Sequence, residues 1–527
     1  MASPYESLDL PPAMIESATP AADWVVVWPV ALALVGAGLL VMLRGRRDMQ
    51  VAFAAAFVAA IVVSNIYLVM RVFEAGPLAM TMGRWLPPFG ISFAADMTGA
   101  LFSLAASVSA LVVVFYAQSE IDSREHRFGF YPLLLLLLGG VCGSFLTGDV
   151  FNLYVWFEVM LISSFGLIVL GGRKVQLDGA VKYGFLNFLA TSFFLMAIAY
   201  LYGLTGTLNF ADLASKADDL PLGAMLTVAA LFLFAFGMKA AAFPANAWLP
   251  ASYHTPAISV SALFGGLLTK VGAYAAIRVL MVVLPEGRLM LEPVIAAVAL
   301  ATMLLGPLGA LAQTNIRRAI GFLVIGGIGA LFAGLALGTQ HGIGGAVLYA
   351  THSILTLTAF YLAAGVVEKM SGTQDIRLMG GIYAANAPLS IVFVVLVFAV
   401  AGLPPFLGFW PKLLLVEGGV RAGQWFLVAG LLLNSLLTLM AASRIWAHVF
   451  WRNGPEGERS EQPNTMLRAL TGAEKRYALG STVVLVALIV VLGLFPNWLF
   501  TASGMAGFDM LDPTRYIDAV FAEVNRP

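Results

Sequence analysis

Four ionisable side chains lie in strongly apolar stretches of the sequence: Glu158, Lys239, Lys270 and Lys412. Ionisable groups are costly in hydrocarbon, and in membrane segments they usually mark ion or proton pathways. A long basic side chain can instead extend its amine to the membrane surface. That alternative suits Arg278, which is nearer a helix end, but not Lys270, which has apolar turns on both sides. Glu158 is too short to reach the surface, so it needs a partner, either in a structural ion pair or in proton transfer.

Two histidines and one aspartate extend this set. Imidazole titrates near neutral pH and can relay protons, although a single buried histidine often only bonds to a neighbouring helix. His352 falls between Lys270 and Lys412 in the order of the predicted spans, which favours a relay. His254 falls in a predicted inside loop, and we expect it to lie where protons enter from the cytoplasm. Asp96 fits a helix cap as well as a functional group.

Prolines accompany two of the lysines. Pro244 follows Lys239 by five residues, and a group of prolines precedes Lys412, namely Pro404, Pro405 and Pro411. Proline removes a backbone hydrogen bond and breaks a helix, and lipid cannot solvate the freed carbonyl groups. A common proline kink explains either position alone. Two breaks that each adjoin a lysine are typical of transporters built from repeated halves.

The composition identifies the class of protein that carries these residues. Of 527 residues, 60% are hydrophobic and only 11% are charged, with a mean hydropathy of +0.90. Soluble domains carry about 25% charged residues, so the chain is predicted to be an all-α polytopic membrane protein. Its net charge is zero, which argues against nucleic-acid binding. A single cysteine and five scattered histidines predict neither a disulfide framework nor a metal site, and we expect no cofactor.

About 20 apolar residues are needed for each helical crossing. The sequence predicts fourteen spans, at approximately 24–44, 50–73, 92–117, 130–147, 150–171, 180–203, 221–246, 256–284, 289–313, 317–338, 342–368, 386–417, 423–450 and 474–500. Of the 29 Lys and Arg residues, 18 fall in loops predicted inside, 7 in outside segments and 4 within spans. This bias predicts both termini on the outside. The acidic N-terminus also lacks the basic region of a signal peptide.

The order of the spans suggests an internal repeat. Lys239 and Lys412 fall in the seventh and twelfth spans, so two units related by a shift of five spans would have opposite orientations. We therefore expect discontinuous seventh and twelfth helices in two inverted five-helix units. The predicted division is residues 1–129 for helices 1–3, 130–284 and 285–450 for the two units, and 451–527 for a cytoplasmic loop, helix 14 and the C-terminal tail.

Three segments carry a family resemblance. They are TGDVFNLYVWFEVMLISS at 147–164, WLPASYHTP at 248–256 and SALFGGLLTKVGAY at 261–274, supported by GTLNFADL at 206–213. They resemble the antiporter-like subunits shared by complex I, membrane hydrogenases and Mrp-type cation/proton antiporters. The resemblance covers roughly the third to the thirteenth span and is strongest for the D-type subunits of Mrp antiporters. Like the spacing, it implies fourteen spans and two inverted units.

The resemblance also implies functional roles. Glu158 and Lys239 would form the charged pair of the first unit, Lys270 would link the units, and Lys412 would be the terminal lysine. The chain would then be a proton-translocating subunit, not an enzyme, in a bacterial cell-membrane antiporter that exchanges Na⁺ or K⁺ for H⁺. Its partners would be subunits of the A, B, C, E, F and G types.

Two other functions remain alternatives. One is a proton-pumping subunit of a complex I-like or hydrogenase-like redox or carbon-uptake complex. The other is a quinone-reducing membrane enzyme, which no cofactor motif supports. The chain also departs from the family pattern: Thr356 stands where several relatives carry a lysine, and the residues just after Pro244 lack the histidine that complex I relatives carry there. A second half-channel would then depend on His352 and water.

Overall fold

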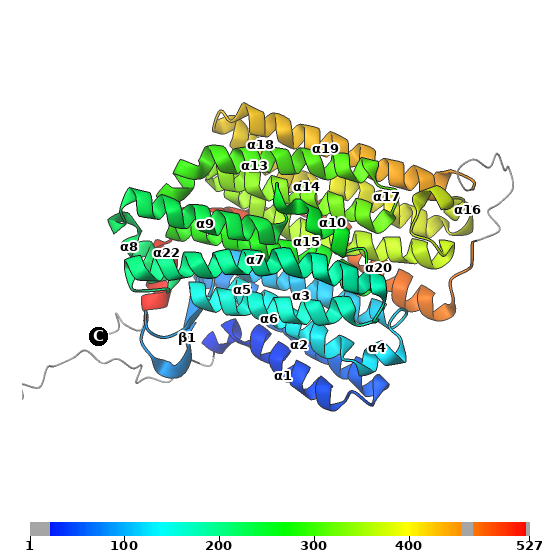
Figure 1. The fold of residues 1–527 in the computed structure, drawn as a ribbon, viewed down its shortest axis with the longest axis horizontal. Helices are drawn as coiled ribbons and strands as arrows, with labels where there is room; N and C mark the ends of the chain where they lie inside the picture. The colour runs from blue at the N-terminus through cyan, green and yellow to red at the C-terminus, as the bar shows by residue number, and fades with distance from the viewer. Residues whose placement is uncertain (1–19, 21, 455–466, 523–527) are drawn as a thin grey trace, which may run out of the picture.

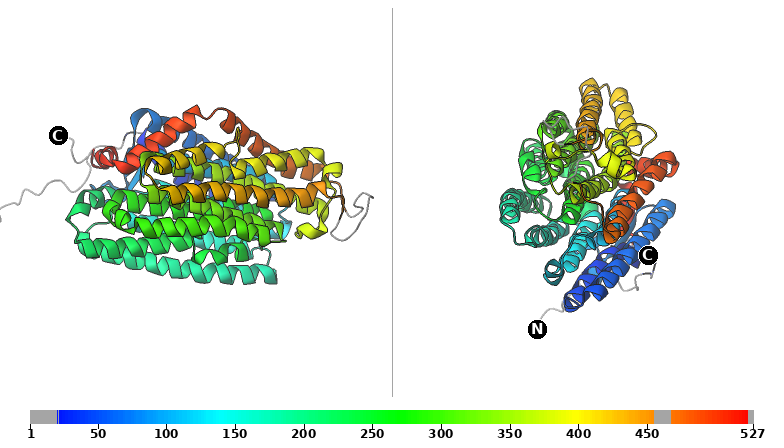
Figure 2. Two further views of the ribbon diagram at one scale, coloured as in Figure 1. Left: turned by 90° about the horizontal axis from the view of Figure 1, so that it is seen from above. Right: turned by 90° about the vertical axis from the view of Figure 1, so that its right-hand side faces the viewer.

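A computed structural model describes residue 20, residues 22–454 and residues 467–522. Long helices run side by side in one bundle (Figure 1), and the end-on view shows α1 and α2 at one edge (Figure 2). The first helices are α1 (Trp28–Met42), α2 (Arg47–Ala75), α3 (Met97–Ala117), α4 (Ser123–Arg127), α5 (Phe130–Leu146), α6 (Val150–Val169), α7 (Lys174–Thr205), α8 (Phe210–Lys216), α9 (Leu222–Ala240), α10 (Trp248–Ser252) and α11 (Ile258–Leu263). The others are α12 (Thr269–Arg278), α13 (Pro285–Ala312), α14 (Ile316–Leu337), α15 (Gln340–Ser371), α16 (Ile382–Ala385), α17 (Ala387–Ala401), α18 (Phe409–Arg421), α19 (Trp425–Trp446), α20 (Gly480–Leu494), α21 (Asn497–Leu511) and α22 (Thr514–Phe521).

The helices confirm the all-α membrane class. Within the described residues, eleven helical segments are long and apolar enough to cross a membrane. Three shorter apolar helices, α1, α5 and α17, coincide with three further predicted spans. The exact number of fourteen crossings stays a prediction, as do the inverted arrangement of the two units and the placement of the termini. Most of the acidic N-terminal segment lies outside the described residues.

The third predicted span begins later than its apolar pattern indicates. Residues 92–95 form a strand, β2 (Ser92–Ala95), which pairs antiparallel with β1 (Leu78–Thr81) so that Leu78 lies opposite Ala95. Helix α3 begins at Met97, because the Asp96 side chain caps it by accepting a hydrogen bond from the Gly99 N–H at 2.9 Å. The prediction of a helix from residue 92 is therefore wrong by five residues.

The seventh and twelfth predicted helices are discontinuous, as expected. Helix α9 ends at Ala240, and the chain turns through Ala241, whose φ of +59° is left-handed, before α10 begins at Trp248. Helix α17 ends at Ala401, and α18 begins only at Phe409. Prolines occupy both gaps, since Pro244 follows α9 and Pro404 and Pro405 follow α17, whereas Pro411 lies in the first turn of α18.

The eighth predicted span lies at the centre of the bundle. It comprises α11, a π-helical segment η5 (Phe264–Leu268), α12 and a second π-helical segment η6 (Val279–Val283). The most apolar 18-residue stretch of this span is buried throughout, as is that of α15, the helix against which η5 packs. These two spans are shielded by the rest of the chain, so polar groups on them must find partners inside the protein.

Candidate functional site

Lys270 lies in the first turn of α12 and is fully buried. Its Nζ donates a hydrogen bond of 2.6 Å to the carbonyl oxygen of Gly265, inside the π-helical segment η5. A π-helical segment shifts the backbone pairing from the fourth to the fifth residue and is frequent at functional sites. The amine is thus held by its own span rather than by a carboxylate.

Lys412, in the first turn of α18, is held by the end of the preceding helix. Its Nζ donates to the carbonyl oxygens of Ala401 at 2.7 Å and Val400 at 3.3 Å. The last carbonyls of a helix have no partner within that helix and carry partial negative charge. The break between α17 and α18 therefore makes an acceptor site for an amine.

Lys239 has a different environment. It lies in the last turn of α9, and its buried Nζ is 5.2 Å from the centroid of the Phe157 ring, a cation–π distance. Within the described part of the chain this amine has no hydrogen-bond partner. Glu158 directly follows Phe157 on α6. It is half-buried, and its Oε1 also has no hydrogen-bond partner among the described residues. The Glu158 charge acts on Lys239, yet the two side chains do not form a direct ion pair in this conformation.

His352 lies on α15 next to the break between α17 and α18. Its Nδ1 is 3.0 Å from Thr356 Oγ1, a hydrogen bond that holds the orientation of the ring. A Cβ placed on Gly408, in the break, would lie 2.8 Å from His352 Nε2. The charges of Lys270 and Lys412 both act on the imidazole. His352 therefore adjoins the break that precedes Lys412, and its helix α15 also packs against η5, which binds the Lys270 amine.

A close contact between backbones joins the Lys239 and Lys270 helices. A Cβ on Gly272 would lie 2.7 Å from Ala240 N and 3.0 Å from the Lys239 carbonyl carbon. Only glycine lets α12 approach the end of α9 this closely. The buried groups thus form a sequence of adjoining sites on α9, α12, α15 and α18, with Glu158 beside the first.

His254 lies apart from that sequence, in the turn between α10 and α11. Its Nδ1 is 3.0 Å from the carbonyl oxygen of Pro250. Burial and the nearby Arg318 charge lower the pKa of the imidazole. Its place at a cytoplasmic mouth stays a prediction.

Arg278 corrects one expectation. It does not extend to a membrane surface: only 1% of it is exposed, and its Nη2 is 2.6 Å from Asp96 Oδ2. Tyr274 Oη accepts a hydrogen bond from Arg278 Nε at 3.3 Å, and the guanidinium lies 5.2 Å from the centroid of the Tyr516 ring. The local sequence does show Asp96 as a possible cap, but its partner lies 182 residues away, which no local pattern indicates.

Comparisons with known proteins agree with this arrangement. Residues 147–438 match the family described as the transmembrane region of NADH:quinone oxidoreductase and Mrp antiporters. Two relatives are named as the D subunit of an Na(+)/H(+) antiporter. The one from Alkalihalophilus pseudofirmus is 36% identical over 499 residues, covering 94% of this chain and 99% of its own length. The one from Bacillus subtilis is 35% identical over 500 residues, with the same two coverages.

Two solved structures share the fold over almost the whole chain. A chain of the Mrp complex from Dietzia has a TM-score of 0.86 and 28% identity, and the match covers 95% of this chain and 100% of that one. A chain of the membrane-bound sulfane sulfur reductase, an archaeal respiratory membrane complex, has a TM-score of 0.85 and 28% identity, with coverages of 94% and 99%. These relatives indicate a transporter subunit of a multisubunit membrane complex rather than an enzyme. The chain belongs to the proton-antiporter family that NADH:quinone oxidoreductases share with Mrp antiporters, and within that family to the antiporter D subunits.

Proposed function

We propose that this chain is the proton-translocating subunit of an Mrp-type antiporter that couples export of Na⁺ or K⁺ to uptake of H⁺ across a bacterial cell membrane. Its partners are subunits of the A, B, C, E, F and G types, and both of its termini face outward. The observation that carries the proposal is the row of adjoining buried groups, namely Lys239, Lys270, His352 and Lys412. Identity to the named D subunits supports the antiporter role over a redox complex.

The different environments of the three lysines suggest where the proton begins. Backbone carbonyls accept hydrogen bonds from Lys270 and Lys412, whereas Lys239 has no acceptor among the described residues. The charged form of Lys239 therefore depends most on Glu158. The negative charge of Glu158 acts on the lysine, although the two side chains form no hydrogen bond. In our proposal, approach of Glu158 favours a charged Lys239, and withdrawal of Glu158 favours release of the proton toward Lys270.

The energies allow the pair to couple proton uptake to another event. One proton that enters through a potential of 100 mV releases about 2.3 kcal/mol. Breaking a buried ion pair by removing one partner costs about 3–5 kcal/mol. Separation of a Glu158–Lys239 pair is therefore of the same order as the energy that one entering proton supplies.

The later steps use the sites along the central helices. The proton passes from Lys270 to His352, whose ring Thr356 holds, and then to Lys412 at the twelfth-span break. Proton transfer needs donor and acceptor within hydrogen-bond reach directly or through one water. Ordered water between these side chains is part of the proposal.

The test replaces Glu158 or Lys239 with alanine in the assembled complex. We expect Na⁺- or K⁺-dependent collapse of a pH gradient in everted vesicles to be lost, with the amount of assembled complex unchanged. Lys216→Ala is the matched control, because this half-exposed lysine at the end of α8 forms an ion pair with Asp212 one turn away. Wild-type exchange in either relay variant would refute the proposal. Proton movement that needs a redox substrate and no alkali cation would favour the redox complex.

A further inference from the structure

The helix α3 lies against the eighth span, which carries Lys270, and it supplies an acid at each of its own ends. Asp96 precedes α3 and binds Arg278 at the last residue of α12 with a distance of 2.6 Å. The other oxygen of the same carboxylate caps α3 through the Gly99 N–H. One buried carboxylate therefore fixes the beginning of α3 and the end of α12 to each other.

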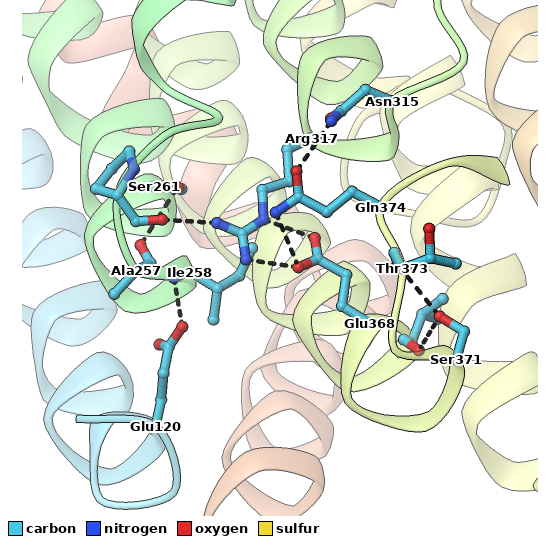
Figure 3. A network of polar contacts seen from close by, with 12 residues as sticks. Glu120, Ala257, Ile258, Ser261, Asn315, Arg317, Glu368, Ser371, Thr373 and Gln374 are labelled. Atoms are coloured by element: carbon cyan, nitrogen blue, oxygen red, sulfur yellow. Dashed lines mark hydrogen bonds and ion pairs between the residues drawn. The ribbon is translucent and has the colours of Figure 1, made fainter. Parts of the chain in front are cut away.

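Glu120 makes the corresponding contact three residues after α3 ends. Its Oε1 accepts from the Ile258 N–H at 2.6 Å, and its Oε2 accepts from the Ser259 N–H at 2.9 Å and the Ser259 hydroxyl at 2.6 Å. The first N–H groups of a helix lack partners within it, and α11 has no side-chain cap of its own. Glu120 is thus the N-terminal cap of α11, supplied from another helix (Figure 3).

Further ion pairing holds the same end of the span. Arg317 of α14 donates from Nη1 to the Pro256 carbonyl oxygen at 2.7 Å. Its Nε and Nη2 bind the two oxygens of Glu368 on α15 at 2.6 and 2.5 Å. Lys369 donates to the carbonyl oxygen of Ser119, in the turn that carries Glu120, at 2.9 Å. The beginning of α11 is therefore fastened to three other helices.

Among the described residues, no charged side chain of another helix binds the middle of the span, where the contacts are neutral, such as the Tyr274 hydroxyl that donates to the Phe145 carbonyl oxygen at 2.8 Å. There the backbone runs through the π-helical segment η5, and the Lys270 amine bonds to Gly265 of the same span. The hydroxyl of the neighbouring Thr269 is buried without a hydrogen-bond partner among the described residues. Bending of the span is therefore easiest between Ile258 and Arg278, where the π-helical segment η5 already interrupts the regular pairing.

We propose that α3 is a brace that fixes both ends of the Lys270 span, so that movement during proton transfer is confined to the π-helical middle. Asp96 and Glu120 are then positioning residues for Lys270, and neither exchanges a proton with it. The inference rests on the proposed function, in which Lys270 receives the proton from Lys239. It adds that the relay depends on two acids that lie at opposite ends of another helix.

Amide hydrogen exchange on the purified complex tests the brace independently of transport. Glu120→Gln removes the charge that caps α11, and we expect exchange at residues 258–262 to become about tenfold faster. Asp96→Asn weakens the contact with Arg278, and we expect amide exchange at residues 276–282 to become faster as well. Asp122→Asn is the matched control. Asp122 lies two residues after Glu120, and its side chain caps the short helix α4 instead of α11. Unchanged exchange at both ends would overturn the brace, whatever the transport results for Lys239.

Transport measurements then separate positioning from simple destabilisation. We expect each single variant to slow cation-dependent proton exchange and to shift its pH profile, because the surroundings of Lys270 change. The double variant is expected to be less impaired than the product of the two single effects, since one brace is already lost in either variant. The proposal would be overturned if the double variant lost as much activity as the product of the two single effects. It would also be overturned if the pH profile of proton exchange were the same in the variants as in the wild type. Ser259→Ala, which removes only one of three bonds to Glu120, serves if the stronger variants do not assemble.

Discussion

Replacing Gly272 with alanine tests whether the proton passes between α9 and α12. An ideal Cβ at this position lies 2.7 Å from Ala240 N, 3.0 Å from the Lys239 carbonyl carbon and 3.1 Å from Ala240 Cα. All three neighbours are backbone atoms, so no side-chain rotation relieves the contact. The two helices must therefore separate by several tenths of an ångström at the contact between the Lys239 and Lys270 segments.

The expected effect on stability is modest, and the expected effect on transport is large. Overpacking a close contact costs about 1–3 kcal/mol, and alanine regains about 0.5–1 kcal/mol over glycine inside a helix. The net destabilisation of roughly 0–2.5 kcal/mol should leave the complex assembled. Proton transfer, in contrast, depends on exact geometry, and a 1 Å misplacement can lower a rate about a hundredfold. We expect cation-dependent proton exchange to fall about ten- to a hundredfold.

Gly237→Ala on α9 is the matched control. It lies two residues before Lys239, and a Cβ there has no neighbour within 4 Å. It should keep wild-type exchange, measured as cation-dependent collapse of a pH gradient in everted vesicles, with assembly followed by immunoblot. If Gly272→Ala exchanges at the wild-type rate in normal amounts of complex, protons do not cross at this contact and the reasoning is wrong.

Three further perturbations have defined outcomes. His352→Leu removes the imidazole that bonds to Thr356 and should slow exchange without loss of complex; an unchanged rate would remove His352 from the path. Lys412→Met leaves the Ala401 carbonyl without its amine and should abolish exchange in the vesicle assay, with retained exchange arguing for another terminal group. Burial, together with the Arg47 charge, lowers the pKa of His126 to about 4 from an ordinary 6.5. The unfolded chain therefore binds more protons than the folded chain between these values, and stability falls as the pH drops below about 6.5. Thermal unfolding should show a flatter pH dependence for His126→Phe, and an equally steep one would contradict the assignment.

The sequence predicts well what is decided locally. Long apolar runs fix the membrane class, because few polar groups are available to cover a soluble surface. Prolines mark the discontinuities after α9 and α17, because proline lacks the backbone N–H that a regular helix requires, although Pro293 and Pro307 lie inside α13 without ending it. The lysines beside these discontinuities are therefore recognisable as candidates from the order of residues alone. Their roles in proton transfer stay a prediction.

What the sequence does not reveal is decided between distant segments. Arg278 looks like a residue that reaches a membrane surface, because its local position is near a helix end. Its partner Asp96 belongs to another span, and that contact keeps the guanidinium buried. The cap that Glu120 provides for α11 is equally remote, with 138 residues between the partners. A local pattern contains no signal for either contact, and the π-helical segments of the same span have no sequence signature comparable to proline.

The three buried lysines differ in their hydrogen-bond acceptors, because irregular backbone supplies carbonyl oxygens to two of them. Lys270 uses a carbonyl five residues earlier in its own span, and Lys412 uses the last carbonyls of the preceding helix. Both acceptors are part of the fold and remain whether the amine is charged or neutral. Lys239 has only the Phe157 ring and the nearby Glu158 charge. Because a carboxylate side chain can move and a helix carbonyl cannot, the proposed relay is most readily controlled at Lys239, through half-buried Glu158.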